Sequence, residues 1–243
     1  MTSSRALGDR RLYLCTPDRS DLVAFVVAVS ISALGRTVSA DDADATAILD
    51  KAMKAMGGKD KLKKIVVAVC KFKGTLRLGD NTEHDFTGQI IMQGLDRVRT
   101  ETEIDFLGQK QKMLAIVNGD KVIQVFGHMP VQPDDAVARL KRSLNLAIIP
   151  VTIAPLAGQR FKIGSAGEEK VGGRPAVVLK VTCPDGTDFT ISFDKESGLP
   201  VKAVGKVFTL DGQQVTQERT YSGYKDFEGI KVALAKACKT LGL

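Results

Sequence analysis

Three carboxylates that alternate along one predicted strand are the residues best placed to do chemistry. Glu101, Glu103 and Asp105 stand two residues apart, so in a strand they project from one face with about 7 Å between neighbours. This separation suits a carboxylate pair that activates water, as in inverting glycoside hydrolysis. The reaction also needs one carboxyl group whose pKa is raised by burial. Because Arg97 and Arg99 begin the same face, we interpret it as solvated, structural charge.

Other residue types that commonly carry chemistry are scarce. The chain has two histidines, His84 and His128, which we expect at a strand edge and in a loop. Neither lies in an HExxH pattern, and the sequence has no CxxC, nucleophile-elbow or phosphate-loop motif. We therefore expect no metal, no cofactor and no enzymatic activity.

The charge of the chain is spread evenly. Its 35 Lys and Arg and 28 Asp and Glu give a formal net charge of +7, and they alternate in mixtures without a long basic block. This distribution favours general solubility over nucleic-acid binding.

Three cysteines, Cys70, Cys183 and Cys238, follow residue 40 at wide spacings. An odd number at such spacings predicts no disulfide framework. We expect Cys70 to be a small core residue, with a Cys70–Cys183 bridge as the alternative.

The first 40 residues have the features of a secretory signal peptide. Residues 22–34 are apolar and uncharged but too short for the roughly 20 residues that a bilayer requires. Arginines precede this run, and small residues stand at −3 and −1 of a cut after Ala40. We predict a cleaved leader at residues 1–40 and one periplasmic or secreted domain at 41–243. The alternatives are a buried core helix at residues 22–34 and twin-arginine export through Arg10-Arg11.

The strongest helical pattern lies at residues 43–64. Its apolar residues recur at i, i+3, i+4, i+7, i+8 and i+11 and therefore form one stripe: Ala45, Ile48, Leu49, Ala52, Met53 and Met56. Asp42 or Asp44 can cap its start, and Gly57-Gly58 end its first segment. Burying each large side chain of the stripe contributes about 1.5–3 kcal/mol, so the helix needs a cover.

From residue 66 the apolar period changes to 2, which predicts strands. We expect an antiparallel meander of strands at residues 66–78, 85–92, 98–106, 111–117 and 121–126, with a tight hairpin at Asn118-Gly119. A second amphipathic helix at 136–149, ended by Pro150 and Pro155, separates the meander from further strands. Those strands are expected at residues 161–163, 176–183, 188–194, 200–210 and 213–221.

These elements predict an α+β fold, an incomplete antiparallel β-barrel whose strongly curved sheet wraps around the N-terminal helix and the central helix. The two helices offer narrow stripes, so part of the inward apolar surface stays uncovered and favours a lipid tail over water. The residues expected to line it are Ile48, Leu49, Met53, Phe72, Leu76, Ile90, Met92, Ile104, Phe189 and Ile191.

Several turn and strand-start motifs resemble those of the LolA-like outer-membrane lipoprotein-sorting proteins. They are ILDKA at 48–52 with MGG at 56–58, GGRPA at 172–176, FDKESGLPV at 193–201 and YSGYKDFEGIK at 221–231. In that family an incomplete barrel offers an apolar concave face to acyl chains. The resemblance implies lipid or lipoprotein acyl chains as ligands and a membrane-associated donor or acceptor protein as partner. The family's usual proline and long strand do not follow here, so we expect a short last strand or a helical tail.

Two functions follow from these observations. The first is an exported periplasmic carrier or binding protein that holds acyl chains without chemistry. The alternative is a secreted structural or interaction module with a closed, self-filled core. A continuous apolar cavity would favour the carrier, and a dry core would favour the module.

Overall fold

The computed structural model describes residues 11–14, 42–65, 67–77, 82–106, 108–127, 129–130, 136–185, 187–208 and 213–241. Its helices are α1 (Asp42–Ala55), α2 (Lys59–Lys63), α3 (Ala136–Thr152) and the 3-10 turn η1 (Ala154–Ala157). The strands before α3 are β1 (Arg11–Leu14), β2 (Ala68–Arg77), β3 (Glu83–Gln93), β4 (Arg97–Phe106), β5 (Gln109–Asn118), β6 (Lys121–Phe126) and β7 (Met129–Pro130). The strands after it are β8 (Lys162–Val171), β9 (Arg174–Thr182), β10 (Asp188–Asp194), β11 (Pro200–Phe208), β12 (Gln214–Phe227) and β13 (Ile230–Leu241).

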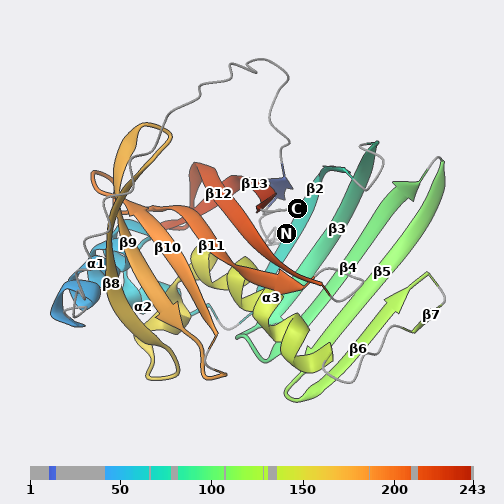
Figure 1. Cartoon of the computed structure of the whole chain (residues 1–243), viewed down its shortest axis with the longest axis horizontal. Coiled ribbons are helices and arrows are strands. Elements are labelled where there is room, and N and C mark those ends of the chain that lie inside the picture. Colours follow the sequence, from blue (N-terminus) through green and yellow to red (C-terminus); the bar gives the residue numbers. More distant parts are fainter. Residues whose placement is uncertain are drawn as a thin grey trace, which may run out of the picture.

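All these strands form one sheet in the order β7-β6-β5-β4-β3-β2-β1-β13-β12-β11-β10-β9-β8. Only β1, between β2 and β13, pairs in parallel. Within the described residues, β7 and β8 are the two edges of the sheet. Figure 1 shows the sheet as two halves, β2–β7 and β8–β13, with α3 running through the space between them and α1 beside β8. The predicted α+β fold, an incomplete antiparallel barrel around two helices, is confirmed.

The end of α1 is fixed by close backbone contact with the C-terminal half of the sheet. Lys231 N donates to Met56 O at 3.0 Å. A Cβ at Gly57 would lie 2.1 Å from Gly229 O, and its φ of 123° is one that glycine tolerates best. The two glycines thus end the first helical segment as predicted, and the basic turn that follows is the short helix α2, anchored by the buried Leu62.

The central helix is longer than expected, because α3 continues through Pro150 to Thr152. Pro150 cannot donate a backbone hydrogen bond, but Ile153 N still donates to Ile149 O at 2.7 Å. Leu146, Ile149 and Ile153 are all buried in the core. Their packing holds the helix together beyond the proline, which the local signal alone did not predict.

The C-terminal strands are also longer than expected. The expected short last strand or helical tail is wrong: β13 pairs with β12 from Ile230↔Phe227 to Leu241↔Thr216. Likewise β8, expected at residues 161–163, runs to Val171, where the Gly172-Gly173 turn leads into β9. Pairing with an adjacent strand satisfies the backbone groups of segments whose own apolar pattern is weak.

Predictions about the leader lie largely outside the described residues, which include neither the apolar run 22–34 nor Ala40. Within the expected leader, Arg11–Leu14 form β1. No helix among the described residues has the length and apolar content to cross a membrane.

Candidate functional site

The helices cover the C-terminal half of the concave face. α1 packs on β8 and β9, and α3 packs mainly on β11. A Cβ at Gly205 of β11 would lie 3.2 Å from Leu146 Cδ1, so the helix approaches this strand closely. Four of the expected lining residues belong to the core cluster here and are at least 94% buried: Leu49, Met53, Phe189 and Ile191. A fifth, Ile48, is half-buried and packs against the cluster.

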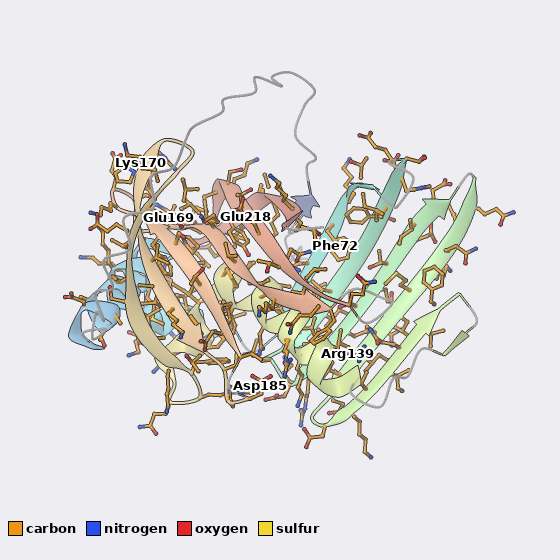
Figure 2. All side chains as sticks on the ribbon, viewed as in Figure 1. Phe72, Arg139, Glu169, Lys170, Asp185 and Glu218 are labelled. Atoms are coloured by element: carbon orange, nitrogen blue, oxygen red, sulfur yellow. The ribbon has the colours of Figure 1, made fainter. Side chains whose placement is uncertain are left out.

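The N-terminal half of the same face carries less cover. Register places Phe72, Gly88, Thr102 and Met113 in one row across β2–β5. The Phe72 ring lies over Gly88, where a Cβ would come within 2.6 Å of it, and 6.1 Å from the Phe86 ring. Figure 2 shows Phe72 in the space between the two halves of the sheet. The half-buried apolar side chains of this face are Phe72, Leu76, Ile90, Met92, Met113, Ala115 and Phe126.

Three other expected lining residues, Ile90, Met92 and Ile104, lie on β3 and β4. Ile90 and Met92 are half-buried and pack against the edge of the core cluster. Ile104 is 6% exposed and pairs directly with the buried Phe86. The structure therefore brings Phe72, Leu76, Ile90, Met92 and Ile104 onto one face of β2–β4.

This face carries a small pocket. It has a volume of 50 Å³ and lies against β4, β5 and β6, with Met113, Ala115 and Phe126 in its lining. Such a volume holds one or two water molecules and no acyl chain. An acyl chain would have to lie along the face itself.

A larger hollow of 780 Å³ lies on the opposite face of the same strands. By strand register, most of the residues that line it project from the side of β2–β5 that faces away from the core. They alternate along these strands with the inward row from Phe72 to Met113. Those outward residues are Lys71, Lys73, Thr87, Gln89, Arg99, Glu101, Glu103, Lys112 and Leu114. Of the expected lining residues, Phe72 alone borders this groove.

The carboxylates of the groove are paired. Glu101 accepts hydrogen bonds from Gln89 Nε2 at 2.9 Å and Arg99 Nε at 2.7 Å, and Glu103 pairs with Lys110 at 2.8 Å. These partners lower the pKa of both carboxyl groups. A general acid needs a raised pKa, so the interpretation of Glu101 and Glu103 as structural charge agrees with the geometry.

A polar group that the sequence analysis missed lies on the concave side of β12 and β13. Arg219 pairs with Ala203, a fully buried core residue, and therefore shares its inward face. Tyr221 is 4% exposed, and its hydroxyl group has no hydrogen-bond partner among the residues that the structure describes. Lys236 is the cross-strand neighbour of Tyr221, with Nζ 5.8 Å from the ring centroid. The sequence did contain a signal for the inward position of Arg219, because alternate residues of a strand share one face and Arg219 alternates with the apolar Val215 and Tyr221.

Remaining candidates for chemistry do not assemble into a site. His84 is buried, and its Nδ1 lies 3.1 Å from Asp105 O, whereas His128 lies outside the described residues. Among the described side chains, no three His, Cys, Asp or Glu form a metal-binding group. Among the described residues, Cys70, Cys183 and Cys238 form no disulfide, so the alternative Cys70–Cys183 bridge is wrong.

Comparison with known proteins yields matches only at the level of the fold. No family model matches the chain, and no curated protein matches it. A lipoprotein-sorting protein domain from Vibrio parahaemolyticus is similar at 12% identity and TM-score 0.49, over 83% of this chain and 87% of that one. A LolA superfamily protein from Nitrosomonas europaea is similar at 14% identity and TM-score 0.45, over 81% and 86%. A DUF1329 family protein from Desulfovibrio piger is similar at 14% identity and TM-score 0.44, over 77% and 82%. LolA-like domains, which the sequence motifs resemble, are thus among these matches.

Proposed function

We propose that the protein is an exported, periplasmic carrier or binding protein that holds the acyl chain of an amphiphile without chemistry. The observation that carries this proposal is the uneven cover of the concave face. Helices α1 and α3 bury the face of β8–β11, while apolar residues of β2–β6 stay half-exposed. An exposed apolar face of this kind commonly marks a binding surface.

The ten expected lining residues have different roles in this proposal. Phe72, Leu76, Ile90, Met92 and Ile104 contact the acyl chain or support that contact. Ile48, Leu49, Met53, Phe189 and Ile191 form the rigid floor behind it. Each methylene removed from water contributes about 0.8 kcal/mol, and Met92 and Met113 can adapt to a flexible chain.

The cargo and partner come from the motif resemblance. It supports a lipid or a lipoprotein acyl chain as cargo and a membrane-associated donor or acceptor protein as partner. The described residues support a weaker alternative, a secreted structural or interaction module, because the inward pocket measures 50 Å³ and Leu49, Met53 and Ile191 fill the core themselves.

Lipid extraction tests the carrier proposal. Natively expressed protein is extracted with organic solvent, and the extract is analysed by mass spectrometry for stoichiometric acyl species. A fluorescent fatty acid is then titrated into delipidated protein at about 10 μM, where saturable binding requires about −7 kcal/mol. Absence of both co-purified lipid and saturable binding would replace the carrier by the structural module.

A pair of variants on β5 locates the binding face. Met113 points to the concave side and its neighbour Leu114 to the outer side. We expect Met113→Lys to abolish probe binding, because it places a charge on the apolar face, and Leu114→Lys to retain it. Circular dichroism checks that both variants fold.

A further inference from the structure

We propose that Arg219, Tyr221 and Lys236 form a binding site for the anionic head group of the amphiphile, through carboxylate or phosphate oxygens. This inference rests on the proposed carrier function and adds the chemical class of the ligand. Nothing in the sequence motifs assigns a role to these three residues.

The three side chains come together from two adjacent strands. Arg219 and Tyr221 stand two residues apart on β12, so both project from its concave side about 7 Å apart. Lys236 faces Tyr221 across the β12–β13 pair, with its Nζ 5.8 Å from the ring centroid. Guanidinium, phenol and ammonium groups all donate hydrogen bonds, and an anionic oxygen is the acceptor that such a set suits.

These donors lack an anionic partner within the described part of the chain. No ion pair there includes Arg219 or Lys236, and the one recorded acceptor for Arg219 is Gln217 Oε1, at 2.7 Å from Nε. The Tyr221 hydroxyl is buried and unpartnered. A buried donor without an acceptor is unfavourable, so a bound anion would satisfy the Tyr221 hydroxyl and pair with the cations of Arg219 and Lys236.

The electrostatic surroundings agree with this geometry. Burial, together with the positive charge of Arg219, lowers the pKa of Lys236 to about 8, while the thiols of Cys70 and Cys238 oppose the shift. No carboxylate is among these neighbours. The site therefore has excess positive charge that a ligand anion would neutralise.

The site adjoins the apolar face proposed for the acyl chain. Cys70 of β2 lies close enough to Lys236 to affect the pKa of its amine, and Cys70 pairs with Ile90 of β3. A head group at Lys236 would thus place the start of its acyl chain near Cys70 and Ile90. Phe72 stands two residues beyond Cys70 on the same face of β2, and its row continues across the sheet through Gly88.

Head-group preference tests the inference. Delipidated protein is titrated with three probes that share a C16 chain: the fatty acid, the lysophosphatidic acid and the uncharged alcohol. We expect wild type to bind at least one anion about tenfold or more tightly than the alcohol. The two anionic arms distinguish a carboxylate from a phosphate head group.

Variants show whether these residues cause the preference. We expect Lys236→Met to weaken binding of the preferred anion about tenfold and Tyr221→Phe to weaken it less, with alcohol binding unchanged. Lys239→Met is the matched control, because Lys239 is exposed on β13 and pairs with Glu218 on the other side. The head-group site would be overturned by equal affinities for the anions and the alcohol, or by a Lys236→Met variant that binds the preferred anion as tightly as wild type. Either result would leave the carrier function standing. Failure of all three probes to bind would overturn the carrier function and this inference with it.

Discussion

Lys236 lies beside the Tyr221 ring, with 5.8 Å between Nζ and the ring centroid, and no acidic residue pairs with it in the described part of the chain. Burial lowers its pKa to about 8, from an ordinary value of 10.5. Below pH 8 the amine is charged in both the folded and the unfolded state, and its burial then reduces stability. Between pH 8 and 10.5 the unfolded state binds more protons, so stability increases with pH.

We predict that Lys236→Met stabilises the ligand-free protein at pH 7 by up to about 3 kcal/mol, the equivalent of the pKa shift. The advantage should shrink as pH rises towards 10. Urea unfolding of both proteins at pH 7, 8, 9 and 10 measures this. The charged or titratable neighbours of Lys236 are Arg219, Cys70, Cys238 and Tyr221, and they are common to both proteins. A stability difference that does not change with pH would contradict the prediction.

Leu49 tests the packing of α1 against the sheet. It is 5% exposed within the core cluster. Leu49→Asp should unfold the protein, because an unpaired buried charge costs several kcal/mol against a total stability of about 5–15 kcal/mol. Thermal unfolding followed by circular dichroism measures the effect.

The control for this variant is Lys54→Asp, which places the same side chain on the exposed face of α1. It should change stability by less than about 1 kcal/mol. A stable, fully folded Leu49→Asp variant would show that the helix does not pack as described.

Sequence patterns predicted local features of this fold well. Alternation along residues 97–105 placed Glu101 and Glu103 on the outer face, where the structure finds them paired. Periodicity is set within a single element and requires no knowledge of its neighbours. For the same reason the stripe of α1 and the break at Gly57 were predictable.

Features that depend on distant contacts were missed. Local rules end α3 at Pro150, but burial of Leu146 and Ile149 extends it. The inward position of Arg219 and Lys236 depends on pairing between β12 and its neighbours, and no local propensity predicts a half-buried, inward-facing cation. Candidate site residues on β2–β4 were found because apolar alternation marks them, whereas polar residues facing inward give no such signal.

Export gives a direct test of domain organisation. If residues 1–40 are a cleaved leader, protein recovered from the cell envelope should begin at Asp41. Intact-mass measurement decides this, and retention of Met1 would refute cleavage.

Cleavage would also change the middle of the sheet. Arg11–Leu14 pair with residues 71–74 of β2, and Tyr13 and Leu14 pair with Ala235 and Lys236 of β13. We expect hydrogen exchange at these positions to be faster in the 41–243 chain than in the uncleaved chain, because their backbone partners are gone. Identical exchange in both chains would argue against pairing of β1 in solution.

Gly57 and Gly58 form a matched pair for the last prediction. Both have positive φ, 123° and 94°, but a Cβ at Gly57 would lie 2.1 Å from Gly229 O, while at Gly58 it would meet nothing within 4 Å. Gly58→Ala should therefore cost only the backbone strain, about 1–2 kcal/mol. Gly57→Ala adds a clash with a backbone atom, so we expect it to cost at least about 2 kcal/mol more. It should also weaken the hydrogen bond from Lys231 N to Met56 O. Urea unfolding gives both free energies, and hydrogen exchange at Lys231 reports on the bond; equal costs for the two variants would show that α1 does not approach the β12–β13 turn this closely.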